Sequence, residues 1–384
     1  MKKNKPLSGT IVLDLTQVLA GPFATQILSD LGAKIVKVEK PEGDDSRKFG
    51  PLKNNKSGYF LSLNRGKKSI KLNLKDDYDK KVFLSLIKSS DVLVENFSYG
   101  ILDKLGFSWK KLKEINSKLI YAKISGFGSN GPLKKYPAYD IIVQAMSGIM
   151  GITGNINKTA RVGTSIGDIV AGLYCVIAIL SAIIERNKSG IAKKIDISML
   201  DCQVAILENA ITRFSVSKKN PKPLGTDHPS IAPFGAFKTM DSQIVIAAGN
   251  QKIFKNLCLA MSRKDLIDNP FFQTNDDRNT NLKLLRTELE KTLKKKKSYF
   301  WLSLFKKNKI PCSSVDKISD VFKNPQILSR NMILKYFDDD FGEIKVAGNP
   351  IKFDNDPKID IAEKAPELDE HRHEILSLIK IKKK

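Results

Sequence analysis

The chain has 384 residues, of which 41% are hydrophobic and 28% are charged, and its formal net charge is +24. This length favours two domains with a substantial core, and the composition is typical of a globular protein. The positive charge would attract a polyanion, but the lysines are spread along the chain and form no concentrated stripe with interleaved aromatic residues. We therefore expect a phosphate-bearing small molecule, and no nucleic acid, as the partner.

The sequence shows no sign of a targeting or membrane segment. The N-terminal residues are basic but are not followed by the apolar run of a secretory signal. The longest apolar run, Ile169 to Ile184, has 16 residues. This is shorter than the roughly 20 residues that span a bilayer, so we expect a buried helix and no membrane contact. The four cysteines form no CxxC pair, which indicates a reducing cytoplasm and argues against a zinc site.

The first 125 residues alternate β-branched runs with segments of helical periodicity. The predicted strands are Thr10–Leu15, Lys34–Glu39, Ser69–Leu74, Asp91–Glu95 and Leu119–Ser125. The predicted helices between them are Pro22–Leu31, Asp76–Ser89 and Gly100–Asn116. This order predicts a parallel sheet with right-handed crossovers, and such sheets bind ligands at the carboxyl ends of their strands.

The remaining residues predict a smaller domain and a return to the first one. Ser147 to Thr164 is a Gly, Thr and Asn rich loop before the apolar helix, and Ser217 to Pro233 is a Pro and Lys rich linker. Gln243 to Ala248 is a predicted strand, followed by Lys-rich helices. Further on we predict a helix at Val315–Met332, a strand at Phe341–Val346 and a polar tail from Asp354. The predicted domains are residues 1–216, a linker at 217–233, a small α+β domain at 234–310, and a C-terminal return at 311–384.

Two carboxylates stand at the predicted starts of apolar helices. Asp168 follows Gly167 at the end of the loop, where it serves either as an N-cap or as a fixed, ionised and approachable nucleophile. Asp140 precedes a second apolar helix and is also a candidate cap. Its neighbour Tyr139 either packs or donates a hydrogen bond into a site. Local physics alone favours the capping and packing interpretations.

The histidines exclude one class of mechanism from the first domain. The first histidine is His228, and the others, His371 and His373, lie in the C-terminal tail, so a Ser-His-Asp or Cys-His device before residue 228 is excluded. The tail sequence His-Arg-His lacks a supporting ligand cluster, and we expect no metal there. Neither GxGxxG nor a Walker A loop follows the first strand, which weakens the case for nicotinamide and nucleoside triphosphate enzymes.

Basic and amide side chains recur at predicted strand ends and turns, at Lys40, Asn64 to Lys68, and Asn96 beside Phe97. A single lysine of this kind is usually part of a solvated rim. Together the set suits an anionic nucleotide cofactor with an adenine near Phe97.

Several motifs in order resemble the class III CoA-transferase family, which also contains the α-methylacyl-CoA racemases. The matching segments are Leu13–Pro22, Asp30–Ala33, Val36–Pro41, Glu95–Phe97, Gly126–Gly128 with Gly131 and Pro132, and Gln144–Gly148. The resemblance covers nearly the whole chain. It implies an α/β fold with a Rossmann-like large domain and a small α+β domain, in an interlocked homodimer of two threaded rings.

The resemblance also assigns roles to individual residues. Asp168 matches the family's nucleophile, and Gly249 with Asn250 matches its mobile glycine loop, whose amides we expect to stabilise oxyanions. This chain has one glycine there and not a run, which leaves any lid function open. The implied CoA-binding residues are Gln17, Val18, Leu19, Ala20, Lys40, Asn64, Lys67, Asn96, Phe97, Lys104 and Tyr139. No metal is required.

The implied reaction moves CoA between carboxylic acids through an aspartyl-CoA thioester on Asp168. A racemase is the nearest alternative, but the family's histidine base is replaced here by Tyr139. A non-catalytic CoA or polyanion binder is the alternative from another class. The segment from Leu224 to Thr239 resembles the succinyl-CoA:dicarboxylate branch, in which Arg47, Arg161 or His228 would pair with the second carboxylate.

Overall fold

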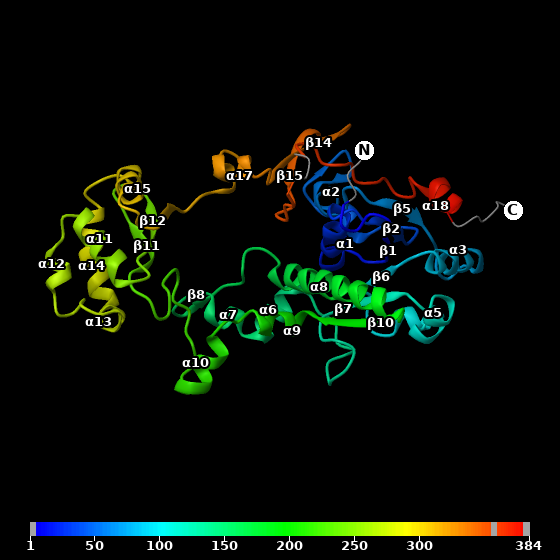
Figure 1. Cartoon of the computed structure of the whole chain (residues 1–384), viewed down its shortest axis with the longest axis horizontal. Coiled ribbons are helices and arrows are strands. Elements are labelled where there is room, and N and C mark those ends of the chain that lie inside the picture. The colour runs from blue at the N-terminus through cyan, green and yellow to red at the C-terminus, as the bar shows by residue number, and fades with distance from the viewer. Residues whose placement is uncertain (1–4, 355–358, 379–384) are drawn as a thin grey trace. The chain divides into compact units, whose positions relative to one another are not determined.

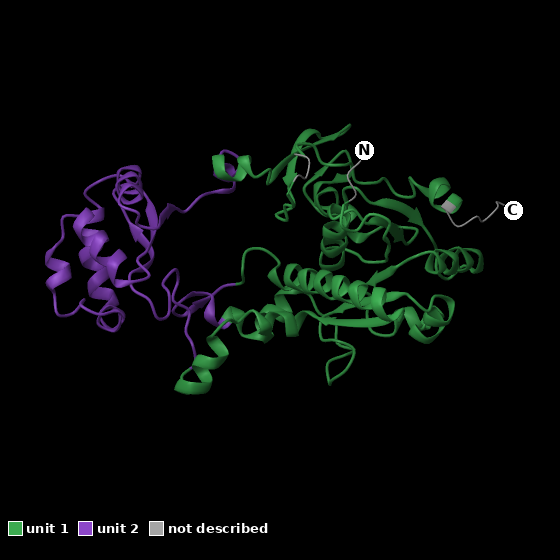
Figure 2. Ribbon diagram, in the orientation of Figure 1, with its two compact units in different colours: residues 1–150, 161–219, 325–384 green, residues 151–160, 220–324 purple. Residues whose placement is uncertain are grey.

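The computed structural model describes residues 5–354 and 359–378, and within them the chain divides into two compact units. Unit 1 consists of residues 1–150, 161–219 and 325–384, and unit 2 of residues 151–160 and 220–324 (Figure 2). Unit 2 thus takes in a ten-residue segment before the apolar helix, and it extends beyond the 234–310 range predicted for the small domain.

Unit 1 is built on a parallel six-stranded sheet with the order β10-β7-β6-β1-β2-β5 (Figure 1). Its strands are β1 (Ile11–Asp14), β2 (Lys34–Glu39), β5 (Lys68–Lys71), β6 (Val92–Glu95), β7 (Ile120–Ser125) and β10 (Lys193–Ser198). The first five confirm the predicted strands within three residues at each end. The sixth, β10, has alternating exposure, and the sequence analysis missed it.

Helices cover both faces of this sheet. The helices of unit 1 that precede the linker are α1 (Ala20–Asp30), α2 (Gly58–Asn64), α3 (Asp77–Lys88), α4 (Ile101–Lys104), α5 (Trp109–Ile115), α6 (Asp140–Ser147), α8 (Ile166–Ser189), α9 (Met199–Ala205) and α10 (Ala210–Ser217). The short elements of this unit are the helix η1 (Asp45–Lys48) and the hairpin strands β3 (Leu52–Lys53) and β4 (Lys56–Ser57). The predicted helix Gly100–Asn116 is divided into α4 and α5 at Gly106, whose φ is +90°.

Side-chain alternation along the strands creates two separate cores. Val12 of β1 belongs to the core beneath α1 and α8, whereas its neighbour Leu13 belongs to the core beneath α3, α4 and α5. Successive strand residues point to opposite faces, so a strand buried on both sides reads as a continuous apolar run. This explains why the central strands were readable from sequence.

The order of the sheet reverses beside β1. The chain proceeds from β1 outward through β2 to β5, and then returns to add β6, β7 and β10 on the other side of β1. In doubly wound sheets ligands bind at the carboxyl ends of the strands where this reversal occurs. The turns after β1 and β6 are therefore the first place to look for a site.

Unit 2 has a three-stranded antiparallel sheet and its own apolar core. Its sheet strands are β11 (Phe234–Lys238), β12 (Gln243–Ala247) and β13 (Cys312–Ser314), and its short hairpin strands are β8 (Gly154–Asn155) and β9 (Lys158–Thr159). Its helices are α11 (Gln251–Ala260), α12 (Asp265–Asp268), α13 (Asn275–Thr280), α14 (Leu282–Leu293), α15 (Ser298–Lys307) and α16 (Ile318–Val321). The helix α7 (Ile149–Ile152) lies at the junction of the two units.

The C-terminal segment rejoins unit 1 through α17 (Pro325–Ser329), the hairpin β14 (Ile333–Asp338) and β15 (Gly342–Ala347), and α18 (Arg372–Leu378). The predicted long helix Val315–Met332 is wrong: α16 and α17 are separate, because Asn324 precedes a proline and is biased away from helical geometry. The tail is also not simply solvated, since Ile375 of α18 is fully buried against the sheet and His371 N–H donates to Ser69 O.

The apolar helix α8 is, among the described residues, the one helix with the length and composition of a membrane span. Core helices of globular proteins meet the same criterion. One side of α8 packs against α1 and the sheet, and its buried residues include Gly172, Cys175 and Ile179. The prediction of a buried helix is therefore correct for the side of α8 that packs against α1 and the sheet. It is wrong for the opposite side, where Ile177 and Ile184 are exposed.

Candidate functional site

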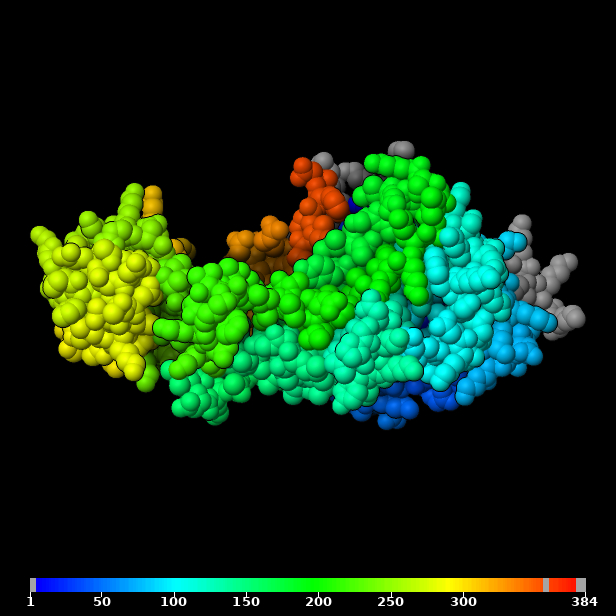
Figure 3. All heavy atoms as spheres, turned by 90° about the horizontal axis from the view of Figure 1, so that it is seen from below, coloured from blue at the N-terminus to red at the C-terminus, as the bar shows by residue number. Residues whose placement is uncertain are grey.

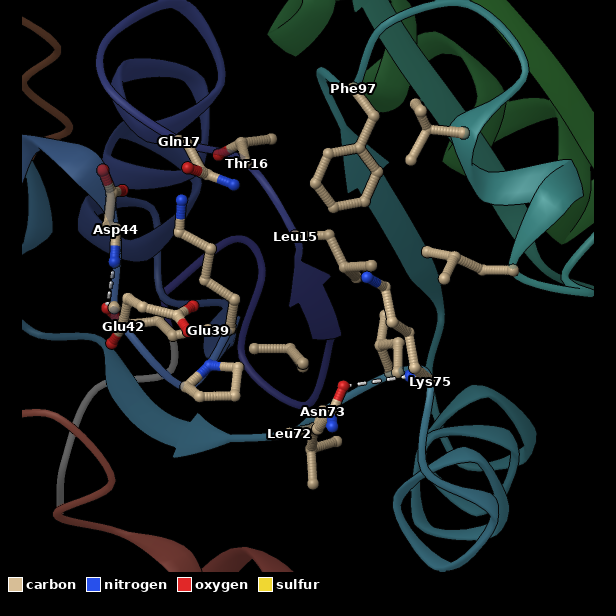
Figure 4. Close-up of a pocket in the computed structure, with 17 residues that line it drawn as sticks. Leu15, Thr16, Gln17, Glu39, Glu42, Asp44, Leu72, Asn73, Lys75 and Phe97 are labelled. Carbon is tan, nitrogen blue, oxygen red and sulfur yellow. Dashed lines mark hydrogen bonds between the residues drawn. The ribbon is translucent and has the colours of Figure 1, made fainter.

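A cavity of about 410 Å³ opens at the carboxyl edge of the unit 1 sheet. The turns after β1, β2, β5 and β6 contribute its lining, as the topology predicts. Figure 4 shows Gln17 and Phe97 on one side of this space and Leu72 and Asn73 on the other. The size lies in the range of small-molecule sites.

The lining of the cavity combines an apolar floor with charged groups of both signs. Leu15, Leu72 and Phe97 offer surface for a flat, apolar ring, and Lys40 and Lys75 add positive charge. The carboxylates in the lining are Glu39, Glu42 and Asp44, of which Glu39 is paired with Arg47 and Asp44 with Lys37. Lys40 pairs with Asp45 at 2.6 Å, but both side chains are about half exposed, so this pair is easily exchanged for an anionic ligand. The cavity is suited to a nucleotide with its base inside and its phosphates at the rim.

Buried charges support the loop that forms the wall of the cavity. The side chains of Lys37 and Asp44 are fully buried and form an ion pair of 2.8 Å. Arg47 donates to both carboxylate oxygens of Glu39 at 2.7 Å and covers the ring of Phe60 at 3.8 Å. Arg47 is therefore already engaged within the fold.

Asn64 and Lys67 belong to a second buried cluster and do not line the cavity. The Lys67 ammonium donates to Asp14 Oδ2 at 3.1 Å, to Thr25 Oγ1 at 2.8 Å and to Asn64 Oδ1 at 2.9 Å. Burial lowers the pKa of Lys67 to about 8, against the opposing effect of Asp14. Direct contact with a bound cofactor would require this cluster to open, so the arrangement does not support the CoA contact expected of these two residues.

Asp168 lies in the first turn of α8, and it is not the N-cap. The helix begins at Ile166 with Ser165 in the N-cap position, and the Ser165 side chain forms no capping hydrogen bond. The capping interpretation of Asp168 is therefore wrong. Because α8 is the crossover between β7 and β10, its N-terminus lies at the same sheet edge as the cavity.

The N-terminal end of α8 lies close to the start of α1. A Cβ atom added at Gly172, one turn after Asp168, would lie 2.8 Å from Ala20 O. This close approach explains the glycine inside a long helix. It also brings the first turn of α8 beside the turn formed by Val18, Leu19 and Ala20, the residues expected to contact the cofactor.

Asp140 and Gln144 of α6 close the loop that carries Asp168. Asp140 Oδ1 accepts the N–H of Gly167 at 2.8 Å, and its Oδ2 accepts Gln144 Nε2 at 2.7 Å. Gln144 Oε1 in turn accepts the N–H of Val162 at 2.9 Å. Both ends of the segment from 162 to 167 are thus bound to one helix. Asp140 is a loop anchor and not the cap predicted from sequence.

The surroundings of Asp168 disfavour its charged form. Burial raises the pKa of Asp168 to about 7, and the negative charge of Asp140 adds to this effect. Sequence analysis missed Tyr59 of α2, whose pKa is raised to about 12 by burial and by the charges of Asp168, Asp44 and Asp140. No motif around Tyr59 marks it; only the fold brings it to these carboxylates.

The remaining predicted residues lie in several settings. The Asn96 side chain binds the backbone of Gln17: its Oδ1 accepts the Gln17 N–H and its Nδ2 donates to the Gln17 carbonyl, each at 2.9 Å. Lys104 is exposed on α4, and Tyr139 is 79% exposed before α6. Gly249 and Asn250 belong to unit 2, where the Asn250 side chain caps α11 by accepting the N–H of Ile253 at 3.0 Å.

Groups that would hold a metal ion do not gather in the described ranges 5–354 and 359–378, where no cluster of three or more His, Cys, Asp or Glu residues occurs. His371 accepts a hydrogen bond from the Ser69 N–H at 3.4 Å, and His228 accepts one from the Ser230 N–H at 3.1 Å.

Known proteins of similar sequence and structure identify the family of this chain. The family model described as CoA-transferase family III matches residues 7–372. The chain is 42% identical to acetyl-CoA:oxalate CoA-transferase of Acetobacter aceti, over 96% of this chain and 94% of that protein. It is 38% identical to human (Homo sapiens) succinyl-CoA:glutarate CoA-transferase, over 98% of this chain and 86% of that one. A CAIB/BAIF family crystal structure from Brucella suis superposes with a TM-score of 0.88 at 36% identity, covering 98% of this chain and 100% of that one.

Proposed function

This chain belongs to CoA-transferase family III, and we propose that it moves CoA from succinyl-CoA to a dicarboxylic acid through a covalent intermediate on Asp168. The observation that carries the proposal is the position of Asp168. Its carboxylate lies in the first turn of α8, whose N-terminus is at the same edge of the sheet as the cavity.

A carboxylate in this position is suited to nucleophilic catalysis. A nucleophile must be ionised when it attacks, yet a fully solvated carboxylate is weakly reactive. Partial burial, together with the charge of Asp140, raises the pKa of Asp168 to about 7, so its charged form has a high proton affinity. At neutral pH a large fraction is still ionised, which fits the pKa expected of a group used near that pH.

We assign the nucleotide part of CoA to the cavity at the carboxyl edge. The adenine would lie against Phe97 and the aliphatic floor, and the phosphates would lie near Lys40 and Lys75. Lys104 on α4 is close in sequence to the lining residues Ile101 and Leu105 and is a further candidate for the phosphates. The pantetheine arm would then lead along the Val18–Ala20 turn toward Asp168.

In the proposed reaction, CoA passes from the donor acid to the acceptor acid through covalent intermediates on the Asp168 carboxylate. Asp168 attacks the thioester carbonyl of the donor, the C–S bond breaks, CoA leaves as the thiolate, and a mixed anhydride of Asp168 with the donor acid remains. The thiolate then attacks the Asp168 carbonyl, which releases the donor acid and leaves an aspartyl-CoA thioester. The acceptor carboxylate then attacks the aspartyl-CoA carbonyl, which releases the CoA thiolate and gives a second mixed anhydride. The thiolate attacks the acceptor carbonyl of this anhydride, which yields the new acyl-CoA and frees Asp168.

We infer a dicarboxylic acceptor because the relatives named above act on oxalate and glutarate. Of the three residues considered for the second carboxylate, Arg47 is occupied by Glu39. Arg161 is exposed on the loop that leads to Asp168, and among the residues that the structure describes its guanidinium donates to the carbonyls of Val162 and Gly163, at 3.1 and 3.0 Å. Since a guanidinium has five donors, Arg161 retains the capacity to bind a carboxylate.

We further propose a homodimer of the interlocked form that the family resemblance implies. Large apolar side chains are exposed along α6, α8 and α10, namely Ile141, Met146, Leu173, Tyr174, Ile177, Ile184, Ile211, Phe214 and Val216. The segment from α6 to α10, coloured teal to green, faces the viewer across unit 1 in Figure 3. A second copy would cover such a surface.

We also propose a cytoplasmic location, because Cys175, Cys202 and Cys258 are free and buried thiols, as is typical of proteins in a reducing compartment.

The test is acyl exchange with a matched pair of variants. Purified protein is incubated with succinyl-CoA and a panel of mono- and dicarboxylic acids, and new acyl-CoA products are followed by mass spectrometry. Asp168→Ala should abolish exchange, whereas Asp103→Ala, at an exposed carboxylate on α4, should retain it. Arg161→Ala should lose dicarboxylic acceptors selectively. Full activity in Asp168→Ala, or no new acyl-CoA with any acid, would contradict the proposal.

A further inference from the structure

The turn after β1 has a backbone conformation that its sequence does not favour. Val18 has a φ of +67°, in the left-handed region that β-branched residues rarely adopt. Such a conformation is unfavourable for a β-branched residue and persists only where the surroundings impose it. The residues that impose it are all visible in the structure.

Three side chains from distant parts of the chain bind the backbone of this turn. Lys37 Nζ donates to Thr16 O at 2.8 Å, and Asp44 Oδ1 accepts the N–H of Val18 at 3.1 Å. Between these two contacts, Asn96 accepts the N–H of Gln17 and donates to its carbonyl, each at 2.9 Å. Four successive backbone groups are therefore held by side chains and not by a neighbouring strand.

The groups that hold the turn are themselves fixed. Lys37 and Asp44 form the fully buried ion pair beneath the cavity wall, and Asp44 Oδ1 also accepts the N–H and the hydroxyl of Ser46, at 2.9 and 2.7 Å. On the helix side, a Cβ added at Gly21 would lie 2.2 Å from Thr16 Cγ2, so Thr16 has no room to shift toward α1. The backbone of the turn is thus held at Thr16, Gln17 and Val18.

The exception is the side chain of Gln17. It lines the cavity, and no hydrogen bond to it occurs in residues 5–354 and 359–378 (Figure 4). We propose that Asn96, together with the Lys37–Asp44 pair, is a positioning device that holds Gln17 toward CoA. Asn96 thus acts through Gln17 and does not itself contact the cofactor, although the family resemblance implies a direct contact. This inference rests on the assignment of the cavity to CoA.

A double-mutant cycle between Asn96 and Gln17 separates positioning from direct contact. The affinity of the full chain for CoA is measured by calorimetry in the wild type, Asn96→Ala, Gln17→Ala and the double variant. Loss of the two hydrogen bonds of Asn96 should weaken binding about tenfold. In the Gln17→Ala background the Asn96→Ala change should weaken binding much less than in the wild type, because the side chain that Asn96 positions is gone.

Conservative rescue provides a second measurement. Asp44→Asn retains an oxygen that can accept the Val18 N–H, whereas Asp44→Ala does not, and both remove the charge that faces Lys37. CoA affinity should therefore be several-fold higher in Asp44→Asn than in Asp44→Ala. Thermal melting of each variant identifies any that fail to fold. If either Asp44 variant does, the double-mutant cycle of Asn96 and Gln17 decides the inference.

Each outcome decides the inference. Additive losses in the double variant would show that Asn96 contacts CoA directly, and unchanged affinity in Asn96→Ala would show that the turn needs no positioning; either result overturns it. Equal affinities of Asp44→Asn and Asp44→Ala would contradict the role of the Val18 contact. If the wild type does not bind CoA, the proposed function fails together with the inference, and this is known before any variant is measured.

Discussion

Replacing Asp168 with asparagine should stabilise the folded protein at pH 8 and leave its stability almost unchanged at pH 4. The pKa of Asp168 in the fold is about 7, well above the ordinary value of 3.8. Between these values the folded protein binds a proton that the unfolded chain has released, so the stability contributed by this group falls as the pH rises. The asparagine variant carries no titrating group there and escapes this loss.

The magnitude follows from the raised proton affinity. At about 1.4 kcal/mol for each tenfold change, ionising Asp168 in the fold costs about 4 kcal/mol. Because the side chain is partly exposed, screening reduces this to about 2 kcal/mol. The charge gains about 0.5 kcal/mol from the helix dipole at the first turn of α8, which is too small to reverse the sign. In a chain of 384 residues, with an unfolding entropy of about 2.1 cal/mol/K per residue, a difference of 2 kcal/mol corresponds to a rise of about 2–3 °C in Tm.

The assay is thermal unfolding of the wild type and Asp168→Asn at pH 8 and pH 4. All other titrating groups are shared, so the difference between the two proteins isolates Asp168. The control is Asp103→Asn, which changes an exposed carboxylate on α4 and should shift Tm little at either pH. A Tm difference that is the same at both pH values, or a less stable Asp168→Asn at pH 8, would refute the reasoning.

Three further changes test other parts of the account. Asp140→Asn removes a negative charge that raises the pKa of Asp168, so the pH dependence of kcat/KM should move to lower pH. Gly172→Ala places a Cβ 2.8 Å from Ala20 O and should lower Tm by several degrees, although alanine is by about 1 kcal/mol the better helix former. Ile177→Glu puts a charge on the exposed apolar face of α8 and should convert the expected dimer to a monomer of 42.8 kDa in light scattering.

The controls for these changes come from the same chain. Gly163→Ala meets no atom within 4 Å and has no positive φ, so it should leave Tm unchanged where Gly172→Ala lowers it. Leu284→Glu adds a charge on unit 2 at a leucine that is 42% exposed and should not alter the mass. An unshifted pH profile for Asp140→Asn, a stabilised Gly172→Ala, or a wild type that is already monomeric would each contradict the corresponding step.

The parts of the fold that local pattern determines were predictable. The central strands bury both faces and so appear as continuous apolar runs, and β2 has the predicted bounds Lys34–Glu39. The edge strand β10 alternates lysine, aspartate and isoleucine and gives a weaker pattern. The predicted helix at Val315–Met332 failed because periodicity outweighed a proline within it.

The site divides in the same way. Asp168 could be proposed as the nucleophile from its loop and helix context together with the family resemblance, but the residues that surround it in the fold could not be predicted. Lys67 meets Asp14 across 53 positions and Asn96 meets Gln17 across 79, and no local pattern encodes such pairs. A basic or amide side chain at a strand end looks the same in sequence whether it faces a cofactor or a buried carboxylate.

The most direct test of the central claim is to capture CoA on Asp168. The protein is mixed with succinyl-CoA, quenched in acid and digested with trypsin, and the peptide from Val162 to Arg186 is examined by mass spectrometry. The account predicts that this peptide gains the mass of CoA less one water at Asp168, and that a dicarboxylic acid added before the quench removes the gain. A peptide that remains unmodified while acyl-CoA exchange proceeds would contradict it.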